Sequence, residues 1–105
     1  MKELTNKTFN NFINKEKNLI MVDFWAPWCG PCTIQKEIIE ALEKDNKSNT
    51  IFTSLNVDLE REIVDQLKIY SIPGIYLFKN GEIVYKSEGK IKNESVLSSL
   101  IQEYK

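Results

Sequence analysis

The chain has 105 residues, a formal net charge of −1 and 42% apolar residues, which is typical of one ordinary globular domain. Because the net charge is nearly neutral, we expect no binding to nucleic acid or to an anionic membrane surface. The two cysteines are accompanied by no histidine, which excludes Ser-His and Cys-His catalysis and leaves too few ligands for a typical zinc site. We therefore expect no metal centre.

The N-terminal residues 1–5 are polar, and no apolar segment of the signal-peptide type follows them. No apolar run approaches the ~20 residues that a membrane-spanning helix requires. These features predict a cytoplasmic protein without a membrane anchor. In that reducing compartment a purely structural disulfide is not expected.

Helix and strand patterns alternate along the chain, which favours an α/β domain. Residues 8–15 carry apolar side chains at helical spacing, with Asn6 or Thr8 as the candidate N-cap. Residues 19–26 form a nearly continuous apolar run, as expected of a strand buried on both faces.

A long helix is predicted after the second cysteine, because Ile34, Ile38 and Leu42 recur every four residues, with Ile39 beside them. Lys36 falls on another, charged face of that helix, together with Glu40 and Lys44. Residues 51–57 then alternate between apolar and polar side chains and predict a second strand.

The second half of the chain predicts a helix, a hairpin and a last helix. Asp58 is the candidate cap of a helix that ends before the Pro73-Gly74 pair. Two short strands meet around Asn80-Gly81, a strong hairpin signal. The last helix begins near Asn93. We expect its inner face to consist of Val96, Leu97, Leu100, Ile101 and Tyr104.

The chemistry of the chain is expected at the segment Cys29-Gly30-Pro31-Cys32, which follows a buried strand and opens a helix. At a helix N-terminus the unpaired N–H groups and the helix dipole favour an anion, which lowers the pKa of a thiol below its free value of about 8.5. Cys32 lies one turn further on, close enough to form a disulfide with Cys29. Gly30 permits a tight turn, and Pro31 suits a first helical turn.

Two other interpretations of the cysteine pair remain open at this point. The pair could be chemically inert, although the expected compartment argues against a structural disulfide. It could also be half of a metal site, although the sequence offers no further cysteine or histidine ligand.

Residues 22–32, which read VDFWAPWCGPC, resemble the active-site segment of the thioredoxin family. Residues 71–73 resemble the family's cis-proline loop, and residues 78–82 resemble its hairpin. The resemblance covers essentially the whole chain in register. It implies an α/β thioredoxin fold, in which helices flank both faces of a central mixed β-sheet, as a single domain over residues 1–105.

The resemblance also implies a dithiol–disulfide oxidoreductase that reduces protein disulfides. Cys29 would attack the target disulfide, and Cys32 would resolve the mixed disulfide. Asp23, buried behind the pair, would accept the proton of Cys32. Gly30 and Pro31 would help to set the redox potential. No bound cofactor is implied; the partners would be disulfide-containing proteins and a thioredoxin reductase, and we expect a monomer.

A docking surface for substrates is implied at Trp28, Ile72, Pro73 and Gly89. Each assignment has a plainer alternative: Trp28 could be ordinary packing, and Pro73 could be a trans residue that simply breaks a helix. Asp23 could be a solvated carboxylate at a strand end. Trp25 is better interpreted as a core residue than as part of the site.

Several positions depart from the family pattern. A buried lysine commonly faces the aspartate, but this chain has Ser54 there, so we expect desolvation to raise the pKa of Asp23. Glu37 replaces a proline that kinks the long helix. The rim of the site also differs, at Ser71, Gly74, Glu88 and Lys90. The altered rim leaves a dedicated reductant with few targets as an alternative to a general one, and a non-catalytic binding module as a third.

Overall fold

The apolar run after Asn18 becomes the central strand of a sheet in the computed structural model, which describes residues 1–105. The sheet has five strands in the order β1-β3-β2-β4-β5. The pairs β1–β3 and β3–β2 are parallel, and β2–β4 and β4–β5 are antiparallel. In chain order the elements are β1 (Lys2–Glu3), α1 (Phe9–Lys15), β2 (Ile20–Trp25), α2 (Gly30–Lys44), β3 (Ile51–Asn56), α3 (Arg61–Leu67), β4 (Gly74–Lys79), β5 (Glu82–Glu88) and α4 (Glu94–Tyr104).

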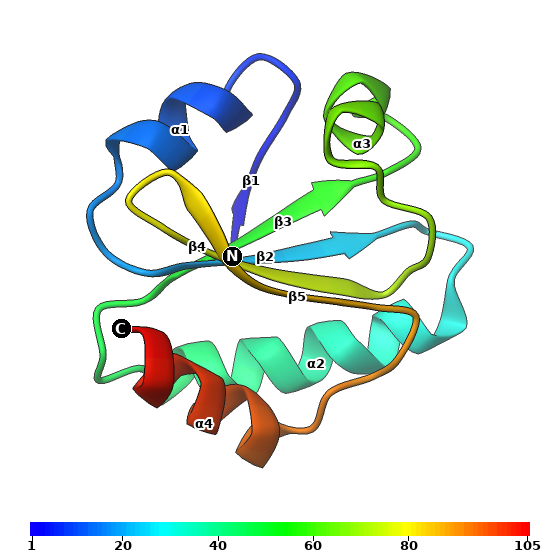
Figure 1. The fold of residues 1–105 in the computed structure, drawn as a ribbon. Coiled ribbons are helices and arrows are strands. Elements are labelled where there is room, and N and C mark those ends of the chain that lie inside the picture. Colours follow the sequence, from blue (N-terminus) through cyan, green and yellow to red (C-terminus); the bar gives the residue numbers. More distant parts are fainter.

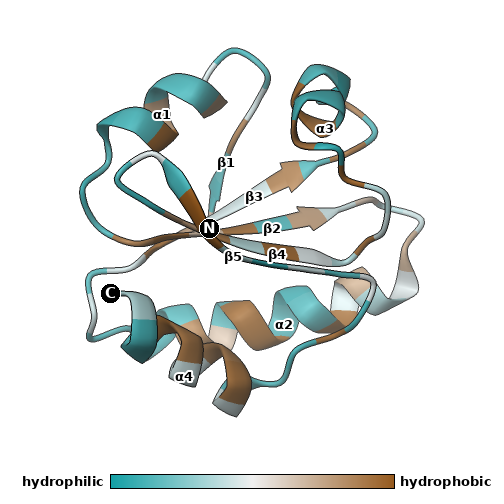
Figure 2. Cartoon of the chain, in the orientation of Figure 1, coloured by the Kyte–Doolittle hydropathy of each residue, from teal (hydrophilic) through white to brown (hydrophobic).

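Helices cover both faces of this mixed sheet, as predicted. Helices α1 and α3 lie on one side, and α2 and α4 lie on the other (Figure 1). In Figure 2 the apolar part of α1 is turned toward the sheet and its polar part away from it. The strand β1 was not predicted, because two exposed residues are too few to show an alternating pattern.

The side chains of β2 alternate between the two layers of the core. Ile20, Val22 and Phe24 pack with residues of α1 and α3, whereas Met21 packs with residues of α2 and α4. Because successive side chains of a strand point to opposite faces, Asp23 lies on the same face as Met21. The strand therefore presents its carboxyl group to the layer formed by α2.

The inner faces of the two long helices differ from the prediction. In α2 the buried residues after the cysteine are Gln35, Ile39 and Leu42, and Ile34 is 52% exposed. A repeat of four residues drifts around a helix that has 3.6 residues per turn, so Ile34 and Leu42 cannot share one narrow face. In α4, Val96 is likewise exposed rather than inward.

Of the two candidate caps for the first helix, Thr8 is the N-cap residue of α1, although its side chain makes no capping bond. The predicted cap of the third helix is wrong. Glu60, not Asp58, is the N-cap residue of α3, and its side chain makes no capping bond. Instead, the N–H of Ile63 donates to Asn6 Oδ1 at 3.1 Å, and the N–H of Asn6 donates to Glu60 Oε1 at 2.9 Å. Asn6 therefore caps a helix 57 residues away in the chain rather than its own neighbour, a contact that local sequence patterns cannot indicate.

The hairpin and the start of the last helix are confirmed. Asn80 and Gly81 both have positive φ angles, 54° and 82°, as a two-residue turn of the I′ type requires. Asn93 caps α4 by accepting a hydrogen bond from the N–H of Val96 at 2.9 Å. None of the helices combines the length and the apolar character needed to cross a membrane.

Candidate active site

The two cysteines form a disulfide at the N-terminus of α2, with their Cα atoms 5.3 Å apart. Cys29 is the N-cap residue, and its Sγ accepts a hydrogen bond from the N–H of Cys32 at 3.2 Å. Pro31 falls in the first turn, where its missing N–H leaves no hydrogen bond unmade. The sulfur of Cys29 thus occupies the place of a capping oxygen, where the dipole of α2 favours negative charge.

The prediction that Gly30 is needed for a tight turn is not supported by its conformation. Its φ angle lies outside the left-handed region, and a Cβ atom built on it would meet nothing within 4 Å. Neither backbone conformation nor crowding within this chain requires glycine there. The open space lies next to the cysteine pair, so a side chain at this position would extend over the surface beside the disulfide.

Asp23 is fully buried, and neither of its carboxyl oxygens has a hydrogen-bond partner. Burial raises the pKa of Asp23 from 3.8 to about 7, and the positive charge of Lys36 opposes that rise. In the parallel pairing of β2 with β3, the residue opposite Asp23 is Ser54, which brings no charge. The predicted direction of the pKa is confirmed, and the alternative of a solvated carboxylate is excluded.

Lys36 is a residue of this region that the sequence interpretation missed. Its Nζ lies 5.4 Å from the centroid of the Trp25 ring. Cys32 and Lys36 are four residues apart, so they share one side of α2, and this spacing is the signal that could have identified the lysine. A cavity of about 190 Å³ opens beside them; its lining residues are Trp25, Ala26, Pro27, Cys32, Thr33 and Lys36.

The rim of the site includes an exposed indole ring. Trp28 is 71% exposed, so the alternative that it is ordinary packing is excluded. Its Nε1–H donates to Asp58 Oδ2 at 2.9 Å. Asp58, which was predicted to cap a helix, therefore binds the indole ring instead. Trp28 and Ile72 line one predominantly apolar cavity of about 260 Å³, which also includes Arg61 and Tyr70.

The loop before β4 lies beside the C-terminal end of β2, the end of the sheet that leads to the cysteines. Gly74 pairs with Phe24, so Pro73 is located where β2 ends and the chain turns toward the cysteines. The Ile72–Pro73 peptide bond is cis, as the family resemblance implied. The N–H of Gly89 donates to the carbonyl oxygen of Pro73 at 2.9 Å. Gly89 has a φ angle of 85°, a conformation that favours glycine.

Glu88 fastens this loop from the neighbouring strand. Its Oε1 accepts hydrogen bonds from the N–H of Tyr70 at 2.8 Å and from the N–H of Ser71 at 3.3 Å. The sequence indicated only that Glu88 departs from the family pattern. The contact joins residues 18 positions apart, so no local pattern could have revealed it.

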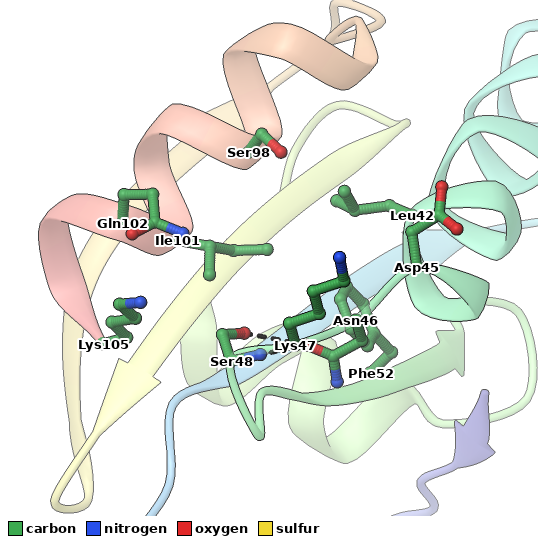
Figure 3. A pocket seen from close by; sticks show the side chains of 10 residues that line it. All are labelled: Leu42, Asp45, Asn46, Lys47, Ser48, Phe52, Ser98, Ile101, Gln102 and Lys105. Atoms are coloured by element: carbon green, nitrogen blue, oxygen red, sulfur yellow. Dashed lines mark hydrogen bonds between the residues drawn. The ribbon is translucent and has the colours of Figure 1, made fainter.

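A further pocket lies between the C-terminal ends of α2 and α4 (Figure 3). It is lined largely by polar side chains, among them Asp45, Lys47 and Gln102. Because the cysteines stand at the other end of the 15-residue helix α2, this pocket lies roughly 20 Å from the disulfide. No group of three or more side chains able to hold a metal ion is present.

Comparison with known proteins identifies the family. The model of the thioredoxin family matches residues 1–103. The thioredoxin of Buchnera aphidicola subsp. Baizongia pistaciae is 37% identical over 89 residues, which cover 85% of this chain and 82% of that protein. The thioredoxin of Chlorobaculum thiosulfatiphilum is 35% identical over 98 residues, covering 93% and 91% of the two chains.

A solved structure of Plasmodium falciparum thioredoxin superposes on the fold with a TM-score of 0.86, at 32% identity and with full coverage of both chains. Sequence and structure therefore agree over the segment that carries the cysteine pair. The chain belongs to the thioredoxin family and is a thiol–disulfide oxidoreductase.

Proposed function

We propose that the protein reduces disulfides in other proteins, with Cys29 as the attacking thiol and Cys32 as the resolving thiol. The observation that carries this assignment is the position of Cys29 Sγ as the cap of α2, where it accepts the N–H of Cys32. A thiolate is the nucleophile of disulfide exchange. The partial positive charge at the helix end favours the thiolate form of Cys29 over that of Cys32.

The reaction proceeds in two exchanges that balance electrons and protons. The Cys29 thiolate attacks one sulfur of the target disulfide, forms a mixed disulfide and releases the first target thiolate. Cys32 then transfers its proton to the Asp23 carboxylate, and the resulting thiolate attacks the sulfur of Cys29. The Cys29–Cys32 disulfide forms, the second target thiolate leaves, and two electrons have passed to the target. Asp23 later releases its proton to water.

The surface around Cys29 is proposed to hold an extended segment of the target. The exposed Trp28 and the neighbouring Ile72 provide apolar contact, since they line one cavity. The loop that contains Pro73 offers backbone groups to the substrate, and Gly89, which donates a hydrogen bond to the carbonyl oxygen of Pro73, belongs to the docking surface. Gly30 and Pro31 separate the two cysteines in the chain, where they influence the redox potential.

In the complete cycle a thioredoxin reductase returns the disulfide to the dithiol, so the protein carries electrons from the reductase to its targets. We further propose that residues 1–105 act as one domain, as a cytoplasmic monomer. The best-supported role is that of a general reductant. The carboxylate of Glu88 in β5, which binds the loop beside Ile72, favours a narrower set of targets, which makes a dedicated reductant the second candidate.

Two cysteine variants test the mechanism in the presence of a reductase and a disulfide substrate. Cys29→Ser is expected to abolish turnover, since the nucleophile is lost. Cys32→Ser is expected to accumulate mixed disulfides, because the second thiol is what clears them. Multiple turnover by Cys32→Ser at the wild-type rate would contradict the two-cysteine mechanism. Partners trapped on Cys32→Ser then separate the two roles: many proteins indicate a general reductant, and a few indicate a dedicated one.

A further inference from the structure

A buried proton acceptor requires something that makes its charged form accessible. Asp23 has no exposed surface and no hydrogen-bond partner in the structure. Ionising such a group without compensation is costly, because a charge is then isolated from water and from any polar partner. If Asp23 accepts the Cys32 proton, some feature of the chain has to stabilise its carboxylate and give its proton a way out.

The elements around Asp23 offer few candidates for this task. The neighbouring strands place Ser54 of β3 and Ile75 of β4 opposite it, and neither is charged. The core layer on this face is otherwise apolar, with Leu97 contributed by α4, apart from Gln35 of α2, whose neutral amide is bonded to the backbone of Lys92. Helix α2 contributes the titratable Cys32 and the charged Lys36. Of these groups, Lys36 is the cation whose field acts on Asp23.

The position of Lys36 relative to Asp23 follows from two pairs of residues, one on β2 and one on α2. Asp23 and Trp25 are two residues apart in β2 and share one face of the sheet. Cys32 and Lys36 are four residues apart in α2 and share one side of the helix. The contact of Lys36 Nζ with the Trp25 ring, 5.4 Å from its centroid, joins the two pairs.

The cavity beside Cys32 completes the arrangement. It has a volume of about 190 Å³, and both Cys32 and Lys36 line it, which is room enough for several waters. Lys36 is exposed as a residue, so the cavity connects this side of the cysteine pair with solvent. The lysine thus lies between bulk water and the buried end of the site.

We propose that Lys36 is a positioning residue for the proton acceptor: held against Trp25 beside the cavity at Cys32, its ammonium stabilises the Asp23 carboxylate and directs the release of the proton to water. The inference rests on the proposed role of Asp23 in resolution by Cys32. In this chain a cation reaches the buried carboxylate from helix α2, while the strand β3 provides only the hydroxyl of Ser54.

An NMR titration of the Asp23 carboxyl carbon in the oxidised protein tests the electrostatic part. Lys36→Met keeps the apolar stem and removes the charge, so the midpoint is expected to rise by about one pH unit. Lys36→Arg should leave the midpoint in place, and Lys36→Glu should raise it further than Lys36→Met does. Lys44→Met is the matched control, because Lys44 lies on the same helix, roughly 12 Å further along it.

The kinetic part uses a small aromatic disulfide that releases two equivalents of a coloured thiol, one for each exchange. At pH 7 the second phase, which reports resolution by Cys32, should slow about fivefold in Lys36→Met, as the ionised fraction of Asp23 falls. The first phase and the Lys44→Met control should not change. Lys36→Arg should restore the wild-type second phase.

Each outcome supports or overturns the inference. If Lys36→Met shifts neither the midpoint nor the second phase while Asp23→Asn still slows that phase, the inference is wrong and the proposed mechanism stands. A shifted midpoint with an unchanged second phase also overturns it. If Asp23→Asn leaves the second phase intact, the proposed role of Asp23 fails, and the inference fails with it; the cysteine variants would then show whether the two-thiol mechanism survives.

Discussion

The interior beneath the cysteine pair and the rim around it differ in whether their polar side chains have hydrogen-bond partners. In the interior, the Asp23 carboxyl is fully buried and neither oxygen has a partner. At the rim, the indole of Trp28 donates to Asp58, and Glu88 accepts from two backbone N–H groups. The side chain without a hydrogen-bond partner is therefore Asp23, which is proposed to accept a proton. The polar groups of the rim, which is proposed to hold the substrate, all have partners.

This difference indicates which property of the protein a substitution in each region should change. Buried polar groups in folded proteins are normally hydrogen-bonded, and an unpartnered buried acid is typical of a functional site. Rim contacts at the surface compete with water and contribute little to stability. Changes at the interior should therefore affect both stability and chemistry, whereas changes at the rim should affect substrate affinity.

Asp23→Asn gives the largest expected effect, on stability as a function of pH. Burial raises the pKa of Asp23 in the folded protein to about 7, whereas the pKa of a solvated aspartate carboxyl group, as in the unfolded chain, is 3.8. Between these values the folded state binds more protons than the unfolded state, so the free energy of unfolding falls as the pH rises and levels off above the folded value. The asparagine variant lacks this penalty.

The difference in the free energy of unfolding between Asp23→Asn and the wild type should therefore grow by about 4 kcal/mol between pH 3 and pH 8.5, given the folded value of about 7. Urea unfolding of the oxidised proteins at a series of pH values measures it. Asp65→Asn, an exposed carboxylate on α3, is the control and should show no such growth. A constant difference across this range would mean that Asp23 is ionised or solvated in the folded protein.

Ser54→Lys sharpens the same comparison with the next largest effect. Ser54 is registered against Asp23 in the sheet, so an ammonium at this position should stabilise the carboxylate directly. The midpoint of the Asp23 titration is expected to fall by about one to two pH units. The isosteric control is Ser54→Met, which adds a side chain of similar length without charge. Equal midpoints for the two variants would show that the added side chain points away from Asp23.

The interior was largely predictable from sequence. The apolar flanks of Asp23, the position of Cys29 at the start of a helix and the hairpin signal at Asn80-Gly81 are all local patterns, and each led to the right element. The family resemblance supplied the cis bond at Pro73. Even the raised pKa of Asp23 followed, because the absence of a lysine at position 54 is visible in the sequence.

The contacts of the rim were not predictable, because they join residues distant in sequence. Asp58 was assigned to a helix cap, but its carboxylate binds an indole 30 residues away. Glu88 was recognised only as a departure, and Lys36 only as part of a charged face. Helical periodicity predicted the helix α2 but not its buried face, since Ile34, a member of the four-residue repeat, is exposed. Only the folded geometry decides which side chains meet across such distances.

Glu88→Leu is expected to weaken substrate binding rather than the chemical step. The variant removes the acceptor for the N–H groups of Tyr70 and Ser71, so the loop beside Ile72 becomes less ordered and must be fixed when the substrate binds. The loss of about 1 kcal/mol corresponds to a KM about fivefold higher with kcat unchanged. Glu88→Gln retains an oxygen acceptor and should lie close to the wild type.

Steady-state reduction of a protein disulfide at fixed reductase concentration separates these outcomes. An unchanged KM for Glu88→Leu would show that the loop is ordered without the carboxylate. A KM that rises equally in Glu88→Gln and Glu88→Leu would instead point to a direct attraction between the negative charge and a cationic substrate segment.

Asp58→Ala gives the smallest expected effect and tests whether the indole orientation contributes to docking. The hydrogen bond from Trp28 Nε1–H to Asp58 Oδ2 is exposed, at 2.9 Å, so water can replace the acceptor once the carboxylate is gone. Stability should change by less than about 0.5 kcal/mol, while KM should rise about twofold, because the freed ring samples orientations that do not fit the substrate. Asp65→Ala removes the same charge from the nearby helix α3 without touching Trp28, and it should leave KM unchanged. Hydrogen exchange of the indole N–H supplies the independent readout: faster exchange in Asp58→Ala with an unaltered KM would show that the bond fixes the ring but that docking does not depend on it.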